Sequence, residues 1–378
     1  MPGSSLRPVG LALLAMLATP AQAAPEPSAV ADQIVAALAA QGEAVATYES
    51  ATGDGASIVV TGVRIGQKDR DNRLVELPEV RLAGVSERDG GGYTATSAAF
   101  DGGTVVDQGR RITWTAAGAS DIVLPSPEEL SADARIRPFG LIEMTGISIF
   151  RSTSDAPATT VDRFVFTMGA IIEGQPTELG FDANGITATV DELVPGRRAL
   201  LMKSLGYDVL EIDLAMAGRF DPFVDTLALD PLVVAVADLG TITATGRFRG
   251  VSVGDFAAGS RRDAAAEAAT VEALSVRFDN AGVVERTLKR QADAMGVEPD
   301  AFVENFLGAV PFMLNFIGNP PFQAKIANAA QTFLRDPRSV TFEANPETPV
   351  SLESLVAAAA TNRSALPDLL AVEVTANE

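Results

Sequence analysis

The chain contains no cysteine and no histidine. Without cysteine it forms no disulfide, and redox thiols, cysteine nucleophiles and Cys/His zinc sites are excluded. Without histidine it lacks the usual general base for a serine nucleophile and the commonest transition-metal ligand. These absences predict that the protein is not an enzyme and that it holds no metal or cofactor.

Aromatic residues other than phenylalanine are also scarce, with one tryptophan and three tyrosines. This leaves little for the aromatic platforms of a sugar-binding cleft. A hydrolase that uses a pair of carboxylates is the less favoured alternative, because pairs arise by chance among 49 acidic residues. Ser252 lies in a nucleophile-elbow pattern, but no histidine and no clear helix accompany it. Asp69, Asp71 and Asn72 indicate an acidic turn, because Arg73 stands where a calcium loop needs a third oxygen ligand.

Positive charge is in short supply. The formal net charge is −20, and it becomes −21 once Arg7 is removed with a leader peptide. A surface of this sign repels nucleic acid and anionic lipid headgroups at long range. We therefore expect no nucleic-acid partner.

The first 23 residues have the features of a signal peptide. Arg7 precedes an apolar run at 9–18, which is too short to span a bilayer. Ala21 and Ala23 supply the small residues before a cleavage site, so the mature chain is expected to begin at Ala24. The alternative is a retained membrane anchor. We expect export to the periplasm without a stable transmembrane anchor, although secretion to the medium remains open.

The remaining sequence predicts an α+β protein that is mostly β. A long, curved antiparallel meander sheet is expected over 24–281, with short helices near its start and middle. A helical section at 282–378 is expected to pack on the sheet and rejoin it through two short strands. The expected strands are 43–51, 57–65, 73–83, 92–100, 110–124, 141–151, 160–169, 178–190, 207–219, 226–236, 239–253, 271–279, 339–344 and 370–375. The expected helices are 28–41, 195–205, 283–295, 299–317, 320–334 and 352–360.

A glycine followed by aliphatic and polar residues recurs along the β-region. The copies lie at Gly62, Gly84, Gly146, Gly185 and Gly250. A glycine inside a strand often marks a bulge or bend, so the repetition favours a curved sheet. The sequence 182–185 also has the composition of a β-turn.

Phenylalanine is concentrated in the expected helices, where six of 18 lie within 302–333. A helix that is apolar nearly all round is either buried against the sheet or in contact with another apolar surface. We favour burial. The sharper hypothesis is that these helices close over a groove that holds an acyl chain or another apolar ligand. Its candidate residues are Phe302, Phe306, Phe312, Met313, Phe316 and Phe322.

Two parts of the sequence resemble known families. The segments 205–207, 221–222, 227–232 and 239–240 resemble a module of uncharacterised exported proteins of Gram-negative bacteria. The opening 41–51 and the strand pattern after it are similar in style to the AsmA-like envelope proteins. That resemblance implies a curved β-groove linked to phospholipid traffic and envelope integrity, with no catalytic residues. Members usually keep an N-terminal anchor, whereas this chain has a cleavable leader.

The favoured hypothesis is a periplasmic, non-enzymatic protein that binds a lipid or apolar small molecule in cell-envelope maintenance. The alternative is a structural scaffold that binds envelope proteins through sheet edges or apolar helices.

Overall fold

The computed structural model describes residues 25–40, 44–67, 70–131, 136–151, 154–194, 196–250 and 269–378. The predicted leader peptide, with Ala21, Ala23 and Ala24, lies outside these residues, as do Asp69 and Ser252.

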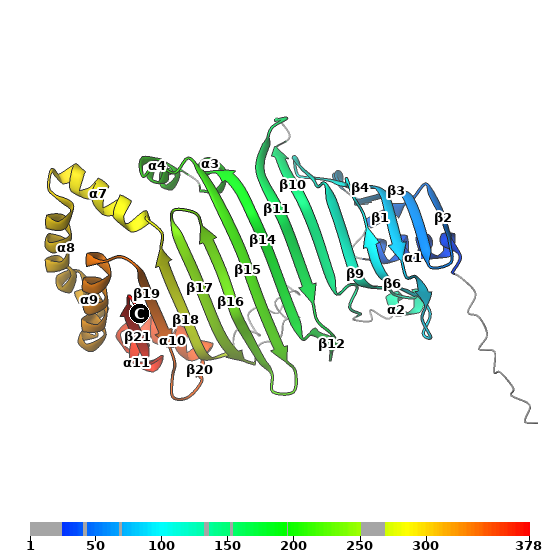
Figure 1. Cartoon of the computed structure of the whole chain (residues 1–378). Helices are drawn as coiled ribbons and strands as arrows, with labels where there is room; N and C mark the ends of the chain where they lie inside the picture. The colour runs from blue at the N-terminus through cyan, green and yellow to red at the C-terminus, as the bar shows by residue number, and fades with distance from the viewer. Residues whose placement is uncertain are drawn as a thin grey trace, which may run out of the picture.

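A single antiparallel sheet of 19 strands runs the length of the molecule (Figure 1). Most strands pair with their neighbours in the sequence, so the sheet is a meander, as expected. Its strands are β1 (Ala44–Thr47), β2 (Ser50–Asp54), β3 (Ser57–Gln67), β4 (Arg70–Ala83), β5 (Ser86–Glu87), β6 (Tyr93–Ala99), β7 (Thr104–Asp107), β8 (Arg110–Thr113), β9 (Ala116–Leu124), β10 (Leu141–Arg151), β11 (Pro157–Met168), β14 (Glu178–Thr189), β15 (Val209–Asp221), β16 (Thr226–Val236), β17 (Gly240–Arg249), β18 (Thr270–Asn280), β19 (Ser339–Ala344), β20 (Val350–Ser351) and β21 (Val372–Ala376). A separate small hairpin consists of β12 (Ile171–Ile172) and β13 (Gln175–Pro176).

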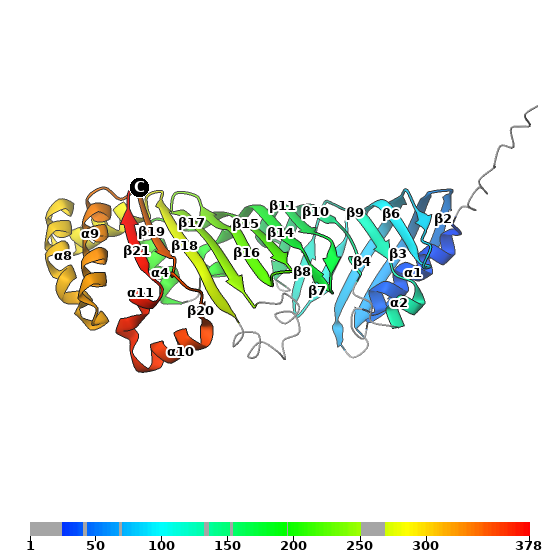
Figure 2. The same ribbon diagram turned by 90° about the horizontal axis from the view of Figure 1, so that it is seen from below.

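Helices lie at both ends of the sheet and above its middle strands (Figures 1 and 2). They are α1 (Pro27–Ala40), α2 (Pro127–Ser131), α3 (Val190–Leu193), α4 (Arg197–Ser204), α7 (Val283–Met295), α8 (Pro299–Met313), the 3₁₀-helix η1 (Leu314–Ile317), α9 (Pro320–Arg335), α10 (Leu352–Thr361), the 3₁₀-helix η2 (Arg363–Ala365) and α11 (Leu366–Leu369). β19 pairs with β18 and β21 pairs with β19, so the C-terminal section returns to the sheet. The predicted fold class, mostly β with a helical C-terminal part, is confirmed.

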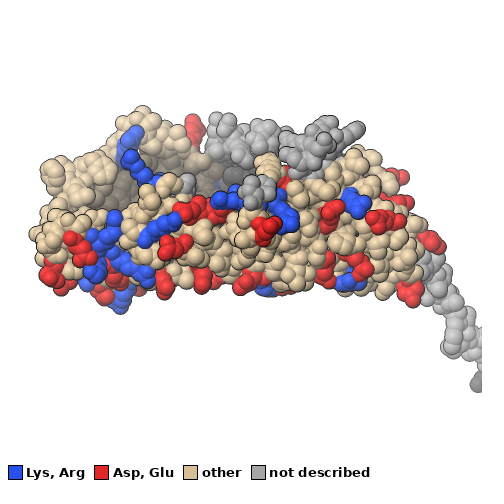
Figure 3. Space-filling view, turned by 90° about the horizontal axis from the view of Figure 1, so that it is seen from above, with Lys and Arg blue, Asp and Glu red and all other residues tan. Residues whose placement is uncertain are grey.

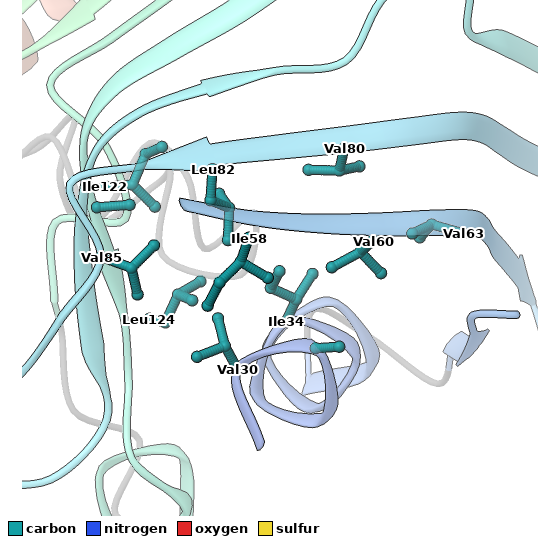
Figure 4. Packing of buried hydrophobic residues seen from close by; sticks show 12 residues of the cluster. Val30, Ile34, Ile58, Val60, Val63, Val80, Leu82, Val85, Ile122 and Leu124 are labelled. Atoms are coloured by element: carbon teal, nitrogen blue, oxygen red, sulfur yellow. The ribbon is translucent and has the colours of Figure 1, made fainter. Parts of the chain in front are cut away.

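One face of the sheet packs on helices, and we call it the helix face. At the N-terminal end, Val30 and Ile34 of α1 pack against Ile58, Val60 and neighbouring apolar residues (Figure 4). Near the middle, Tyr207 anchors a second cluster beneath α3 and α4. The Tyr207 hydroxyl donates a hydrogen bond to the Asp238 carbonyl at 2.8 Å. Helices α1, α2, α10 and α11 all lie on this side (Figure 2).

The opposite, open face is polar because side chains alternate along each strand. Arg163 Nε donates to Glu143 across β10 and β11 at 2.6 Å, and Arg249 pairs with Glu272 across β17 and β18 at 2.7 Å. Phe164 lies on the helix face, as the alternation at 161–168 predicts. Val161 was predicted to face the other way but packs in the same cluster as Phe164. Asp162 is paired in neither ladder: the β10–β11 register passes from Thr145–Arg163 to Ile147–Val161, and the β11–β14 register passes from Arg163–Asn184 to Thr160–Thr187.

Three glycines of the signature lie inside strands as predicted, whereas the glycines at 84 and 250 directly follow the ends of β4 and β17. All five glycines, at positions 62, 84, 146, 185 and 250, have positive φ. Gly185 is typical, with φ of +64° and a Cβ position only 2.3 Å from the Asp162 carboxylate. The Gly185 N–H donates a hydrogen bond to Asp213 Oδ1 at 2.8 Å. The segment 182–185, with its turn-like composition, is therefore a bulge inside β14 and not a turn.

Most predicted elements match the structure within a few residues, and the differences are local. Ser28 was predicted to cap α1, but the helix already begins at Pro27. The strand expected at 43–51 is broken between β1 and β2, where Glu49 lies opposite the Gly62 bend. The strand β7, the helix α2 and the β12–β13 hairpin were not predicted. No helix within the described ranges is long and apolar enough to cross a bilayer.

Candidate apolar-ligand site

Two rows of apolar side chains cross the helix face from β10 to β21. Each row consists of directly paired residues on successive strands, and the two rows lie two residues apart along each strand. The first row is Ile142, Phe166, Phe181, Met216, Leu232, Ala244, Val276, Phe342 and Val374. The second row is Met144, Phe164, Ala183, Leu214, Val234, Ile242, Phe278, Val340 and Ala376. We call them the apolar rows.

The apolar rows are only partly covered by the helices. Ile242 is 46% exposed and Phe342 is 44% exposed, although both lie in the middle of an apolar surface. Figure 3 shows a hollow on this side of the molecule, in which the visible described atoms are mostly uncharged; Lys or Arg side chains lie at its edge, and charged side chains are scattered over the rest of the visible surface. A contiguous apolar surface of this kind is uncommon on a soluble monomer and marks a place of contact.

A third row, next to the first, contains two glycines. Leu179, Gly218, Leu229, Gly246 and Leu274 are paired in that order from β14 to β18. The space beside Gly246 is filled, because a Cβ there would lie 2.7 Å from the Phe248 ring. The space at Gly218 is open, because a Cβ there would meet nothing closer than the Leu179 carbonyl oxygen at 3.7 Å.

A pocket of about 220 Å³ opens at Gly218, and we call it the sheet pocket. Its lining consists of Pro176, Leu179, Met216, Gly218, Phe220, Leu227, Ala228, Leu229 and Phe248. All of these residues are apolar. The volume is below the roughly 300–1,000 Å³ of typical small-molecule sites, so the pocket fits part of a chain and not a bulky molecule. Since its walls offer no charged side chain, the pocket suits a hydrocarbon segment.

A second apolar pocket, the helical pocket, lies between α7, α8 and α9 and has a volume of about 520 Å³. Its lining consists of Val283, Val284, Thr287, Leu288, Gln291, Phe302, Phe306, Phe333 and Leu334. The rings of Phe302 and Phe306 stack with their centroids 6.3 Å apart. Phe333 packs edge-to-face on Phe278, with centroids 6.4 Å apart. The helical pocket therefore adjoins one of the apolar rows.

The structure separates the six predicted ligand residues into groups. Phe302 and Phe306 line the helical pocket, whereas Phe312, Met313 and Phe316 point outward at the end of α8 and on η1. Phe322 is half-buried at the start of α9. Helices α8 and α9 lie at the C-terminal end of the molecule and not over the sheet pocket (Figure 1). Nor is α8 buried on all sides, because only Val303 and Val310 are fully covered.

Among the described residues, none of the ionisable groups with clearly shifted pKa values lines either pocket. Hydrogen bonds from Arg88 lower the pKa of Glu129, and those from Arg335 lower the pKa of Glu304. Burial raises the pKa of Tyr207. Within the described part of the chain, no three acidic side chains gather as a metal-binding group.

The sheet pocket was missed from the sequence, although its residues follow a readable pattern. Met216, Gly218 and Phe220 alternate along β15 with Ala217, Arg219 and Asp221, so the period of two predicts that they share one face. The register that places Gly218 between Leu179 and Leu229 depends on bulges in β14 and β16. A bulge shifts the pairing by one residue, so the strand pattern alone could not bring these residues together.

Comparison with known proteins gave one partial match. A family model described as an uncharacterized protein matches residues 233–377, from the middle of β16 to the end of β21. A search of curated proteins found no match.

Proposed function

We propose that this protein is an exported, non-enzymatic binding protein that holds the hydrocarbon chain of a lipid or another apolar molecule on its helix face. The observation that carries this proposal is the sheet pocket at Gly218, which is open, wholly apolar and continuous with the apolar rows. The resemblance to AsmA-like proteins and the predicted leader peptide support a role in the cell envelope and a periplasmic location.

The physical argument rests on area and on polarity. Most side chains of the apolar rows are only partly buried, and Ile242 and Phe342 stay nearly half-exposed. Exposed apolar area of this kind costs free energy in water, at about 25 cal/mol for each Å² that a ligand could cover. A hydrocarbon chain removes that area from water and makes no hydrogen-bond demand. Because Gly218 has no side chain, the sheet pocket is deeper at this position and gains no polar group there. A pocket of about 220 Å³ with these walls favours a linear hydrocarbon segment over a compact molecule.

The helical pocket is the second place where such a chain fits. Its volume of about 520 Å³ falls within the usual range for small ligands. Thr287 and Gln291 are its polar lining residues. The Thr287 hydroxyl donates to the Val283 carbonyl at 2.7 Å, which leaves its oxygen free to accept a bond from a ligand hydroxyl or amide. Phe302 and Phe306 thus keep the ligand-binding role proposed from the sequence.

The scaffold alternative draws less support from the structure. β1 and β2 form one outer edge and contain only four and five residues. At the other edge α9 lies along β21, where Lys325 donates to the Val372 carbonyl at 3.2 Å. Short or covered edges discourage pairing with another chain.

The direct test is recovery of a ligand. The protein is purified without detergent, and its organic extract is analysed by mass spectrometry. A fluorescent fatty acid is then titrated into the delipidated protein. We expect a lipid or another apolar molecule in the extract and a saturable rise in fluorescence. An empty extract together with no saturable rise would refute the proposal.

A further inference from the structure

The junction between α8 and α9 carries an exposed aromatic patch that the proposed function does not use. Phe312 is 83% exposed and Phe316 is 86% exposed, and Met313 between them is also exposed. We call these three residues the aromatic tip. They lie at the C-terminal end of the molecule, opposite α1 (Figures 1 and 2).

The tip is held firmly in this exposed position. Gly318 ends η1 with φ of +71°, and Asn319 then caps α9 by accepting a bond from the Phe322 N–H at 3.0 Å. The Asn319 amide also donates to the Ser364 carbonyl at 2.9 Å and to Asp368 at 3.0 Å. Farther from the tip, Arg335 of α9 pairs with Glu304 of α8 at 2.8 Å. These contacts fix the ends of the helices on either side of the tip, so the phenylalanines point outward in the folded protein.

The sequence around the tip is free of charge although the protein is strongly acidic. No aspartate, glutamate, lysine or arginine occurs between Glu304 and Lys325, whereas the whole chain has a net charge of −20. The polar side chains of this stretch are amides, chiefly Asn305, Asn315 and the buried Asn319. A segment that enters the boundary between headgroups and acyl chains needs this composition, because an ionised group there is costly.

The size of the patch argues against a protein partner. Side chains of this size and exposure offer about 450 Å² in total, whereas a stable protein interface needs about 800 Å² from each partner. Inserting a few large apolar side chains is enough to hold a protein at a bilayer surface reversibly.

We propose that the aromatic tip inserts into the surface of a lipid bilayer and docks the protein there. The docking is hydrophobic and not electrostatic, because the tip has no cation to attract an anionic lipid and the rest of the molecule is acidic. It is independent of the ligand proposal, since the tip is separate from the sheet pocket.

The test is flotation of the purified full chain with phosphatidylcholine vesicles, which are neutral overall. We expect binding that is insensitive to salt. The protein is expected to bind more weakly to vesicles that also contain phosphatidylglycerol at about 0.01 M salt. This binding should recover at about 0.15 M salt, because the Debye length falls from about 30 Å to about 8 Å and the repulsion between the two negative surfaces is screened. No flotation with neutral vesicles, or stronger binding to anionic vesicles at low salt, would overturn the proposal.

Variants locate the docking site. The double variant Phe312→Ser with Phe316→Ser is expected to weaken binding more than about tenfold, because each phenylalanine loses its transfer into the bilayer. The matched control is Phe223→Ser on the β15–β16 loop, where Phe223 is 81% exposed, and binding should be unchanged. Equal binding by the double variant and the wild type would exclude the tip. The Gly218→Leu variant should still float, which separates this test from that of the ligand site.

Loss of binding by the double variant could also come from misfolding. A second variant therefore reports binding by a change in tryptophan fluorescence. Phe316→Trp adds a reporter to a chain whose one tryptophan, Trp114, is buried. With neutral vesicles, the emission of the new tryptophan should shift to the blue and be quenched by brominated acyl chains. No shift and no quenching would overturn the proposal, as would sedimentation showing that the tip instead joins two copies of the chain.

Discussion

Gly218 on β15 pairs directly with Leu229 on β16, and the space above this glycine is the floor of the sheet pocket. Its φ lies outside the left-handed region, and a Cβ would make only ordinary van der Waals contact, with the Leu179 carbonyl oxygen at 3.7 Å. A larger side chain at this position should therefore fill the pocket without straining the backbone.

Gly218→Leu is expected to reduce the affinity for a fluorescent fatty acid at least about tenfold, a change of about 1.4 kcal/mol. The melting temperature should stay near that of the wild type. Gly66→Leu is the control, because Gly66 also lies in a strand with open space around its Cβ position. If both variants bind the fatty acid as the wild type does, the pocket at Gly218 is not the site.

Gly103 lies against the indole of Trp114, and a Cβ there would come within 1.9 Å of the ring. Trp114 is buried, and its ring N–H donates to the Phe100 carbonyl at 2.9 Å, so the indole has little freedom to move. We expect Gly103→Ala to lower the free energy of unfolding by about 1–3 kcal/mol, the usual cost of overpacking.

Urea unfolding followed by the fluorescence of Trp114 measures this effect directly. Gly66→Ala, where nothing lies within 4 Å of the Cβ position, should change the midpoint little. An unchanged midpoint for Gly103→Ala would contradict the tight contact.

Glu129 of α2 forms hydrogen bonds with Ser126, just before the helix, and with Arg88, just after β5. Its carboxylate accepts the Ser126 N–H at 2.8 Å, and the Ser126 hydroxyl accepts the Glu129 N–H at 3.2 Å, which forms a capping box. Arg88 donates two further bonds to Glu129, at 2.8 and 3.0 Å, and these lower the pKa of the carboxyl group. A lowered pKa means that the stabilisation is present above the unfolded-state pKa and is lost as pH falls through the folded-state pKa.

Glutamine can still complete the capping box, so Glu129→Gln removes mainly the charge that faces Arg88 and should reduce stability by about 0.2–1 kcal/mol at pH 7, the usual worth of such an ion pair. Near pH 2 the difference from the wild type should shrink, because the wild-type carboxyl is then increasingly protonated. Urea midpoints at the two pH values provide the measurement. A difference that is the same at both pH values would show that the charge of Glu129 does not matter.

The contribution of Tyr207 to the stability of the folded protein depends on pH in the opposite direction. Burial raises its pKa in the folded protein, so its contribution to stability is present below the unfolded-state pKa of about 10 and is lost as pH rises through the folded-state pKa. Tyr207→Phe removes the hydrogen bond to the Asp238 carbonyl and should cost about 0.5–1.5 kcal/mol at neutral pH.

At alkaline pH the same variant should lose less stability than the wild type, because phenylalanine does not ionise. Thermal melts at neutral and alkaline pH compare the two proteins. Parallel loss of stability in both would indicate that another group controls the alkaline transition.

Periodicity and glycine position were enough to predict most of the fold. The alternation in β11 placed Phe164 and Phe166 on one face, and the repeated glycines all have positive φ, because local backbone preference decides both features. The phenylalanines of α8 were recognised as unusual. Their division between the helical pocket and the aromatic tip depends on how α7, α8 and α9 pack together, which no local pattern contains. The sheet pocket likewise depends on the one-residue shifts at the bulges in β14 and β16.

The neighbour-to-neighbour pairing of the strands has a consequence for how such a chain varies in length. Each such strand forms hydrogen bonds only to the strands before and after it in the sequence. Inserting a strand therefore lengthens the apolar rows by one position, and deleting a strand shortens them by one position. One antiparallel pair could thus be gained or lost in the middle of this sheet while both helical ends keep their contacts. The span of the apolar surface would then scale with the number of hairpins in the gene.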